Sequence, residues 1–392
     1  MDDFFTVPIN MSSPSHPVPL DRLKTPLVVF QPKLPVADRL LPYLRLIDAN
    51  RWYSNRGPLL ARFEQALADH FAVASDRVIG VANATAGLTA SLLAAGVDDA
   101  GRDGSPLCIL PSWTHEATAV AALRAGLTPW FHEVEEADWS LSPERVADSL
   151  RANPTLAARV SHVIVTAPFG AVVAAEPWRA LSDHFGLAVT IDAASGFDQL
   201  RGGPVDAVVS LHATKVLGVG EGGVVIAQDA QRAARLRDLV QLGLSDERVI
   251  QRAGLNAKLS EYGAAIGLAA LDIWPERRAT LVRLRAHYAA RLGGVPGLSL
   301  WAPEGVSSTL MLRLPGPVAV ETGRRLAARG IATRRWWHAG CHRQPAFAAC
   351  PRHPLPITEA LADSVLGLPF HEDLTLCDID TVVDTLRDVL AD

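Results

Sequence analysis

The chain is poor in lysine, and one of its lysines lies where an amine could react. The 392 residues include 33 arginines and only four lysines, which are Lys24, Lys33, Lys215 and Lys258. Lys215 follows the apolar run DAVVSL, and a glycine-rich stretch comes after it. A lysine that is desolvated in such a place loses its proton readily and can form a Schiff base with a carbonyl. The alternative is a lysine that only reaches out to solvent, and the apolar neighbours of Lys215 argue against it.

A carboxylate lies in a comparable place at the end of another apolar run. Asp192 closes the run LAVTID and is followed by small residues. In open α/β sheets, ligands bind beyond the carboxyl ends of the strands, so Asp192 could face a ligand. On position alone, the plainer interpretation of Asp192 is a helix cap or a turn residue.

Two further segments could contact a flat, phosphorylated ligand. In GVANATAGL, Asn83 or Thr85 could cap a helix whose free N–H groups would suit a phosphate. In PSWTHEAT, Trp113 and His115 come at the end of a run, where a planar ring could stack on a flat ligand. Neither segment is specific by itself, because most strand–helix connections contain such a cap and a single histidine is more often structural.

Two other patterns are weighed and rejected. Gly218, Gly220 and Gly223 have the spacing of a dinucleotide fingerprint, but they precede the apolar run VVIA instead of opening a helix. Three histidines and two cysteines crowd the segment 338–353, but their spacings fit no zinc pattern. We therefore expect neither a nicotinamide site nor a metal site, and we interpret the second segment as a loop over the active site.

The elements that must position these residues can be read from the hydrophobic periodicity. Seven apolar runs follow one another from about residue 76 to 227, and they are RVIGVA, PLCILP, TPWFHEV, SHVIVTAP, LAVTIDA, DAVVSL and GGVVIA. Between them lie segments in which apolar residues recur at the spacing of a helix. This alternation predicts an α/β fold with a mostly parallel, doubly wound sheet and helices on both faces. The shorter connections between the later runs predict some antiparallel pairing at one edge.

The rest of the chain predicts a second unit. The pattern becomes helical after residue 228, with a long stretch from about 259 to 293. Further apolar runs and helical patterns then predict a smaller α/β domain over 294–392, which leaves 26–293 as the large domain. Residues 1–25 are rich in Ser and Pro and are expected to form a loose arm.

The composition excludes several classes of protein. Apolar residues make up 49% and charged residues 20% of the chain, which supplies a large core and excludes intrinsic disorder. The net charge is −5 and no run is rich in Lys and Arg, so neither nucleic acid nor a membrane surface is an expected partner. Four cysteines do not suggest a disulfide framework. An acidic N-terminus and the lack of a long apolar stretch favour a soluble, cytoplasmic protein.

Taken in order, these segments resemble the sugar-nucleotide aminotransferases of the StrS/DegT type, which are fold-type I enzymes that use pyridoxal 5′-phosphate (PLP). The resemblance covers about residues 33 to 390. It is carried by RWYSNRGPLLARFEQALADHF, NATAGL, PSWTHEAT, IDAAS, SLHATK with GEGGVV, GLNAKLSEYGAAIGL and VLGLPFHEDLT. SLHATK and NAKLSEYGAAIGL look most like the subgroup that makes 4-amino-4,6-dideoxy sugars, such as the viosamine synthases.

The resemblance implies a role for the residues that would surround the PLP ring. Lys215 would bind the cofactor as a Schiff base and then serve as the acid and base of the proton transfer. Asp192 would pair with the pyridine nitrogen and keep it protonated. His115 would stack on the ring face, and Ser195 would lie near the phenolic oxygen, where the family often has Gln or His.

It also implies which residues would hold the phosphate. Ser210, Thr85 and Ala86 would bind it within one chain. Asn256 would reach the phosphate of a neighbouring subunit, which implies a homodimer with shared active sites. Two further departures from the family pattern are Ala84, in place of the usual Gly of the phosphate turn, and Lys258, in place of a usual Arg.

These roles predict an enzyme that transfers an amino group from L-glutamate to a nucleotide-linked 4-keto-6-deoxy sugar. The aromatic loop RRWWHAGCHRQPAF, with Trp336, Trp337, His338 and His342, is a candidate for lining the sugar pocket. One alternative is a sugar dehydratase of the same fold, in which the resemblance implies a histidine in place of Lys215. The other is a sensor that binds a ligand without catalysis.

Overall fold

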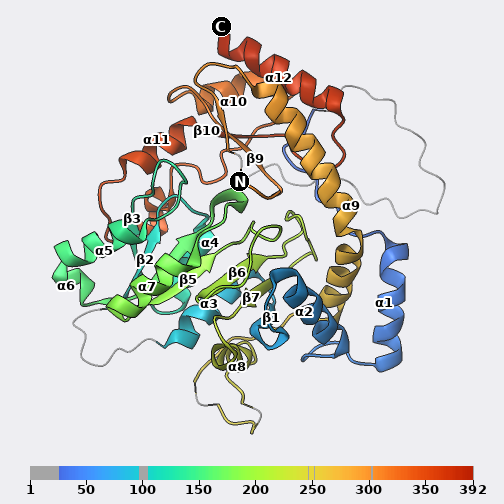
Figure 1. The fold of residues 1–392 in the computed structure, drawn as a ribbon, viewed down its shortest axis with the longest axis vertical. Helices are drawn as coiled ribbons and strands as arrows, with labels where there is room; N and C mark the ends of the chain where they lie inside the picture. The colour runs from blue at the N-terminus through green and yellow to red at the C-terminus, as the bar shows by residue number, and fades with distance from the viewer. Residues whose placement is uncertain (1–25, 97–104, 246, 251, 302, 392) are drawn as a thin grey trace.

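The computed structural model describes residues 26–391 apart from 97–104, 246, 251 and 302 (Figure 1). The arm expected over 1–25 therefore lies outside the described residues. A seven-stranded sheet forms the centre of the molecule, and a three-stranded sheet lies beside it. The long helix α9 (Glu261–Leu292) runs along one side, from the large sheet toward the smaller one.

The large sheet is mostly parallel. Its strands are β1 (Val78–Val81), β2 (Leu107–Pro111), β3 (Thr128–His132), β4 (Val160–Thr166), β5 (Ala188–Asp192), β6 (Asp206–Ser210) and β7 (Gly223–Ile226). They follow one another in space in the order β1-β7-β6-β5-β4-β2-β3. Only β7 runs against its neighbours, β1 and β6. All seven apolar runs are thus strands, and the antiparallel pairing expected at one edge is confirmed.

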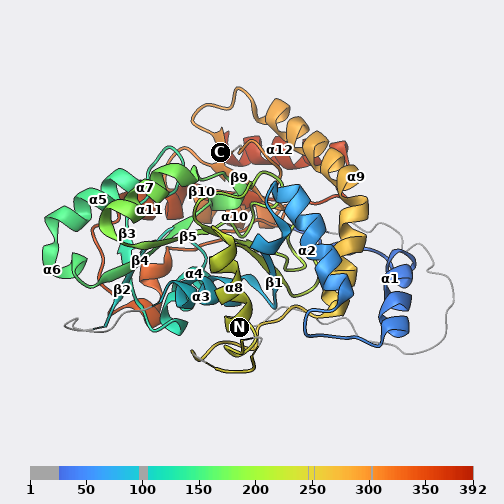
Figure 2. The same cartoon turned by 60° about the horizontal axis from the view of Figure 1, so that its bottom comes forward.

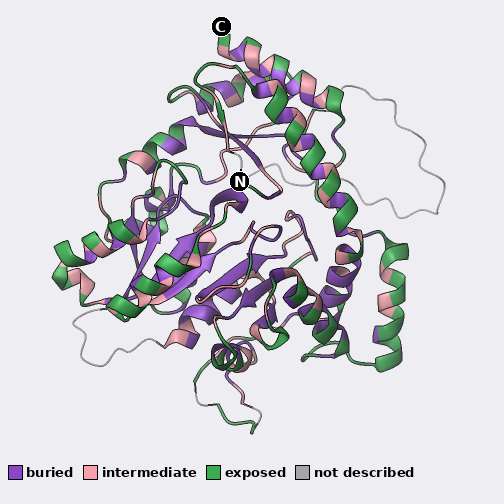
Figure 3. Cartoon of the chain, in the orientation of Figure 1, coloured by how far each residue is buried: buried purple, intermediate pink, exposed green. Residues whose placement is uncertain are grey.

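Helices cover both faces of this sheet (Figure 2). On one face lie α3 (Ala84–Ala95), α4 (Glu116–Arg124) and α8 (Ala230–Leu239), which share a buried cluster with Val208 and Val225. On the other face lie α2 (Pro58–Phe71), α5 (Pro143–Ala152), α7 (Ala175–Phe185) and α9, which share a second cluster with Val209 and Val224. Neighbouring strand residues thus point to opposite faces, and the strands are buried on both sides (Figure 3). The predicted doubly wound α/β fold is confirmed.

The smaller sheet is built from the C-terminal part of the chain. Its strands, β8 (Ser299–Leu300), β9 (Leu310–Arg313) and β10 (Val365–Leu368), are antiparallel. The helices α10 (Ala319–Ala327), α11 (Pro356–Ser364) and α12 (Leu376–Ala391) accompany it. The domain boundary at 293/294 stays a prediction. The chain also contains α1 (Ala37–Asn50), which packs on α9, and the short α6 (Pro154–Ala157). Within the described part of the chain, no helix is long and apolar enough to span a membrane.

A buried glutamate connects the two helices that cover one edge of the large sheet. Glu261, the first residue of α9, is 1% exposed. Its carboxylate accepts hydrogen bonds from the N–H groups of Leu59 and Leu60, both at 2.8 Å. These two N–H groups belong to the first turn of α2, where no intrahelical acceptor exists. Glu261 therefore caps α2 from a position some 200 residues away.

Candidate active site

Two neighbouring strands bring the main candidates together. Asp192 is the last residue of β5, and Ser210 is the last residue of the parallel strand β6. The loop after Asp192 turns back toward β6, because the N–H of Ser210 donates to the carbonyl of Ala194 at 3.3 Å. Lys215 follows Ser210 by five residues. The carboxyl edge of the large sheet therefore brings Asp192, Ser210 and Lys215 together.

Asp192 is a buried carboxylate whose hydrogen bonds come from neutral donors. It is 5% exposed, and no basic side chain of the described residues forms an ion pair with it. The hydroxyl of Thr118 donates to Oδ2 at 2.7 Å, and the N–H of Ala194 donates to Oδ1 at 3.2 Å. Burial raises the pKa of Asp192, while these two hydrogen bonds and the nearby His115 and Lys215 act in the opposite direction. A cationic group beside Asp192 would stabilise its ionised form.

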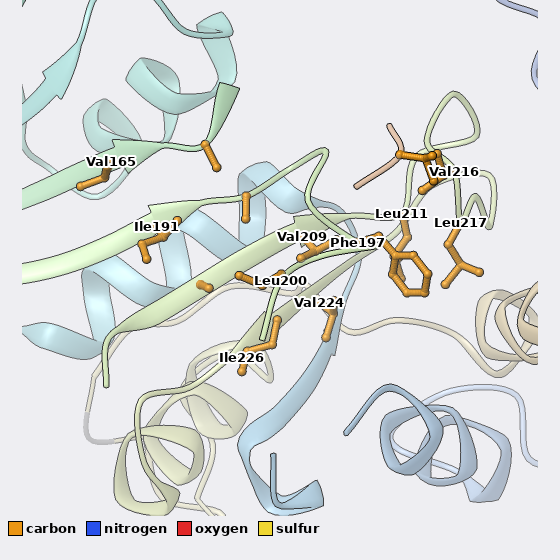
Figure 4. Close-up of a cluster of buried hydrophobic side chains, with 14 of the residues drawn as sticks. Val165, Ile191, Phe197, Leu200, Val209, Leu211, Val216, Leu217, Val224 and Ile226 are labelled. Carbon is orange, nitrogen blue, oxygen red and sulfur yellow. The ribbon is translucent and has the colours of Figure 1, made fainter. Parts of the chain in front are cut away.

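Lys215 is held in an apolar setting. Its neighbours Leu211, Val216 and Leu217 belong to the buried cluster shown in Figure 4. The ammonium Nζ donates a hydrogen bond to Ser195 Oγ at 2.9 Å. Burial lowers the pKa of Lys215, and the charge of Asp192 offsets part of this shift. A larger fraction of the amine is therefore neutral near pH 7, which is the form that attacks a carbonyl.

The N-terminus of α3 forms a turn at the same edge of the sheet. Asn83 is the helix cap, and its side chain accepts the N–H of Ala86 at 2.8 Å. The N–H groups of Ala84 and Thr85, the first two of the helix, have no intrahelical acceptor. They suit an anion, as does the positive end of the helix dipole. Since Asn83 already occupies the N–H of Ala86, the predicted phosphate contact of Ala86 requires the Asn83 side chain to turn away.

A glycine allows this turn to lie close to the sheet. Gly223 begins β7, and a Cβ built on it would lie 2.7 Å from the nitrogen of Ala84 and 2.8 Å from the carbonyl carbon of Asn83. A side chain at position 223 would therefore push the turn away from the strand. Gly223 thus allows a close approach of the turn, and the glycine-rich stretch of 218–223 leads into strand β7 and not into a helix.

His115 and Asn256 lie at the surface of the single chain. The His115 side chain is 64% exposed and caps α4, since its Nδ1 accepts the N–H of Ala117 at 3.1 Å. Asn256 is also exposed, and its Oδ1 accepts a hydrogen bond from Lys258 Nζ at 2.6 Å. The segment of Asn256 runs beside the end of β1, because the N–H of Ala82 donates to the carbonyl of Ala257 at 2.7 Å. Asn256 is therefore free to face a partner.

A hollow beside Lys215 contains residues that the sequence did not single out. Its polar lining includes Lys33, Arg277, His371 and Glu372, which come from the N-terminal segment, α9 and the loop after β10. Arg277 is buried, forms an ion pair with Glu372 and donates to the carbonyl of Val216 at 3.1 Å. Arg277 thus fixes the backbone next to Lys215. Only proximity in the fold brings these residues together, and no spacing along the chain indicates it.

Two of the four side chains named in the loop at 334–347 are buried, and they are Trp337 and His342. Trp337 stacks on Phe169 with ring centroids 4.1 Å apart and meets Trp113 edge-on. His342 is 6% exposed and hydrogen-bonded to Ser112 Oγ at 2.7 Å. Both side chains therefore act in packing. Trp336 is half-buried and contacts Phe30 and Arg334, whereas His338 is exposed.

The histidines and cysteines of 338–353 do not form a cluster. Cys341 Sγ donates to the carbonyl of Thr114 at 3.4 Å, and His353 is hydrogen-bonded to Ser149 Oγ at 2.8 Å. Across the residues that the structure describes, no three side chains of the metal-binding types lie close enough together to hold an ion.

The carboxyl edge of the mostly parallel sheet thus gathers a buried carboxylate, a desolvated lysine and a free helix N-terminus. Together with the family match and the likeness to solved structures, these features identify the chain as a PLP-dependent aminotransferase. The chain belongs to the DegT/DnrJ/EryC1/StrS aminotransferase family, whose model matches residues 37–387.

Individual relatives agree with this assignment. The chain is 25% identical over 366 residues to the dTDP-4-amino-4,6-dideoxy-D-glucose transaminase of Escherichia coli, covering 88% of this chain and 94% of that protein. It is 29% identical over 358 residues to the dTDP-3-amino-3,4,6-trideoxy-alpha-D-glucose transaminase of Streptomyces venezuelae, covering 88% and 90%. Among solved structures, DesI in the presence of its TDP-sugar product matches with a TM-score of 0.84 and 32% identity, covering 94% of each chain.

The residues present fit the cofactor of this family. PLP carries a phosphate, a basic ring nitrogen and an aldehyde. The site offers a helix N-terminus with free N–H groups, a buried carboxylate that forms no ion pair with the described residues, and a lysine whose pKa is lowered. Each group of the cofactor thus finds a chemically suitable partner at one edge of the sheet.

Proposed function

We propose that this protein binds PLP at Lys215 and transfers an amino group from L-glutamate to a nucleotide-linked 4-keto-6-deoxy sugar. The observation that carries the proposal is the convergence of Lys215 and Asp192 at the end of two adjacent strands, beside the free N–H groups of α3. Family membership and the names of the relatives support the same class of reaction.

Each proposed contact has a physical reason. PLP, when bound, supplies a conjugated ring that accepts electrons from the carbon whose amino group moves. Asp192 holds a proton at the ring nitrogen, because an ion pair there would satisfy its buried charge. The N–H of Thr85 and the Ser210 hydroxyl bind the phosphate. His115 covers one face of the ring, and its present exposure leaves it free to do so.

Lys215 has two tasks in this proposal. It binds the cofactor through Nζ, and it moves the proton between the two carbon atoms that exchange it. A lowered pKa serves both tasks, since a neutral amine is both nucleophile and base. Ser195 accepts a hydrogen bond from Nζ at 2.9 Å and so directs the amine within the site.

The relatives bear on which carbon of the sugar receives the amino group. The two relatives named above are transaminases of a 4-amino and of a 3-amino sugar, at 25% and 29% identity. We favour C4 because SLHATK and NAKLSEYGAAIGL resemble the 4-amino subgroup. Incubation with TDP-linked 4-keto-6-deoxy and 3-keto-6-deoxy glucose, followed by NMR of the product, separates the two positions.

The alternatives lack the residue changes that they need. A dehydratase of this fold would have a histidine where Lys215 stands, and Lys215 is present. A sensor without catalysis would be expected to have lost Lys215 or Asp192, and both are in place. A half-reaction with an amino donor distinguishes an aminotransferase from a sensor.

We also propose that the protein works as a homodimer with shared sites. Asn256 is exposed, and the nearby Trp52, Tyr53 and Tyr262 are 49%, 48% and 47% exposed. The N–H of Glu261 donates to the carbonyl of Tyr53, which keeps the three aromatic rings at the start of α9. A second copy of the chain would cover this apolar surface and bring Asn256 to its phosphate.

Subunit mixing tests the shared site. Lys215→Ala and Asn256→Ala proteins are each expected to be nearly inactive. In a mixed dimer, one site would combine the Lys215 of one subunit with the Asn256 of the other, so activity is expected to return. Mixed dimers that stay inactive would show that the two residues do not serve one site.

The first experiment on the reaction is a visible absorption spectrum of the purified protein with PLP. The band of the lysine-bound cofactor is expected to disappear on addition of L-glutamate and to return with the correct keto-sugar nucleotide. A band that does not respond to L-glutamate, L-glutamine or L-aspartate would contradict an aminotransferase. A response to glutamine alone would correct the donor.

A further inference from the structure

Behind Asp192 lies a row of three buried threonines. Thr118 is on α4, Thr114 precedes that helix, and Thr166 is the last residue of β4. Thr118 Oγ1 is 2.7 Å from Asp192 Oδ2 and 2.8 Å from Thr114 Oγ1. Thr114 Oγ1 is in turn 2.8 Å from Thr166 Oγ1. The three residues are 0%, 1% and 4% exposed, so solvent does not compete for these contacts.

When Asp192 is ionised, the hydrogen bonds of the row have a single direction. A hydroxyl has one proton to donate. The Thr118 hydroxyl donates its proton to the carboxylate of Asp192, so it must accept a hydrogen bond from Thr114. The Thr114 hydroxyl thus donates to Thr118, and it must accept a hydrogen bond from Thr166. All three hydroxyls therefore point toward Asp192, and aligned hydrogen bonds of this kind strengthen one another.

The row also favours one charge state of Asp192. The N–H of Ala194 donates to Oδ1, so a proton on the carboxyl would sit on Oδ2 and would point at Thr118. Each hydroxyl would then have to reverse. Within the described part of the chain, Thr166 Oγ1 is hydrogen-bonded to Thr114 alone, so reversal would leave its proton without an acceptor. A buried donor without an acceptor is unfavourable, which opposes protonation of Asp192.

We infer that Thr118, Thr114 and Thr166 form a hydroxyl relay that orients Asp192 and keeps it ionised for the ring nitrogen of the cofactor. These are positioning residues, because none of them would touch the cofactor itself. The inference rests on the proposed function, since it concerns the contact between Asp192 and PLP. It goes beyond that function because it assigns part of the cofactor affinity to Thr114, which is separated from the carboxylate by the hydroxyl of Thr118.

The test uses valine variants, which keep the shape of threonine and remove the hydroxyl. Thr118→Val removes the direct donor to Asp192, and Thr114→Val removes the second link without touching the carboxylate. Thr190→Val is the matched control. Thr190 is equally buried on β5, two residues before Asp192, but its hydroxyl bonds to Ser91.

The measurement is the affinity of each apoprotein for two ligands, followed by quenching of tryptophan fluorescence. One ligand is PLP, and the other is a PLP analogue with carbon in place of the ring nitrogen. We expect the dissociation constant for PLP to rise roughly 10-fold in Thr118→Val and roughly 3-fold in Thr114→Val. It should stay within about 2-fold of the wild type in Thr190→Val. The analogue should bind the three variants and the wild type alike, because it cannot pair with Asp192.

Two results would overturn the relay. If Thr118→Val weakened PLP and the analogue equally, Thr118 would only shape the site. If Thr114→Val bound PLP as tightly as Thr190→Val, the effect would end at Thr118. Thermal unfolding of each apoprotein shows whether a variant is folded, and Thr118→Ser, which restores a hydroxyl, should recover most of the affinity. A wild-type protein that binds neither ligand would instead overturn the proposed function.

Discussion

Replacing Gly223 with alanine should weaken PLP binding through the backbone of the turn that precedes α3. The new Cβ would lie 2.7 Å from the nitrogen of Ala84, whereas an ordinary contact begins at 3.4 Å. The obstacle is backbone, so the turn must move by about 0.7 Å. This shift would carry the N–H of Thr85, which we propose to bind the phosphate, away from it.

The magnitude follows from the loss of one hydrogen bond to a charged group. Such a bond contributes about 1.5–3 kcal/mol, which corresponds to a rise of about 10- to 100-fold in the dissociation constant for PLP. The assay is a PLP titration of the apoprotein, together with the melting temperature of the apoprotein. Free inorganic phosphate should compete with PLP less effectively in the variant than in the wild type.

Gly80→Ala is the matched control for this substitution. Gly80 lies on β1, the strand next to β7, and a Cβ there would meet the flexible end of Leu60 at 2.8 Å. This variant should lose some stability and keep its affinity for PLP. Wild-type affinity in a folded Gly223→Ala protein would refute the assignment of this turn to the phosphate.

Three further predictions concern other parts of the molecule. Lys215→Ala should abolish the visible band of lysine-bound PLP, and Lys258→Ala should keep it; the absorption spectra of the two variants decide. Glu261→Ala should lower the free energy of unfolding by about 2–4 kcal/mol in guanidinium titrations, since two buried N–H groups of α2 lose their acceptor; a loss below about 0.5 kcal/mol would mean that water replaces the carboxylate. Burial lowers the pKa of His132 to about 3, so the unfolded chain binds a proton below about pH 6.5 that the folded protein excludes. As the pH is lowered below 6.5, the free energy of unfolding should therefore decrease less steeply in His132→Leu than in the wild type, by up to about 1.4 kcal/mol per pH unit. Equal slopes of the two proteins, measured by urea unfolding between pH 5 and 7, would contradict this.

The sequence predicted the strands well because each is buried on both faces and reads as a continuous apolar run. The same rule placed Asp192 and Lys215 at one edge, since ligand-binding residues of open α/β sheets follow the carboxyl ends of strands. The antiparallel edge was predictable only in part, because the connections before and after β6, residues 193–205 and 211–222, are similar in length. The first nevertheless joins parallel strands and the second joins antiparallel strands.

Other features depend on contacts between distant positions and could not be predicted. Glu261 caps a helix from the far end of the large domain, and no local spacing indicates this. Thr166 meets Thr114 only because β4 and β2 are neighbours in the sheet. The aromatic loop was expected to line a pocket, yet Trp337 packs against Phe169, since a large apolar side chain gains more from burial than from exposure.

The central claim is that Lys215 is the residue that binds PLP, and peptide mapping tests it most directly. The protein is incubated with PLP, reduced with sodium borohydride to make the lysine–cofactor bond permanent, digested and analysed by mass spectrometry. The account predicts the mass of the reduced cofactor on the peptide that contains Lys215, and none on the peptide with Lys258. A label on Lys258 instead, or no label on either peptide, would contradict it.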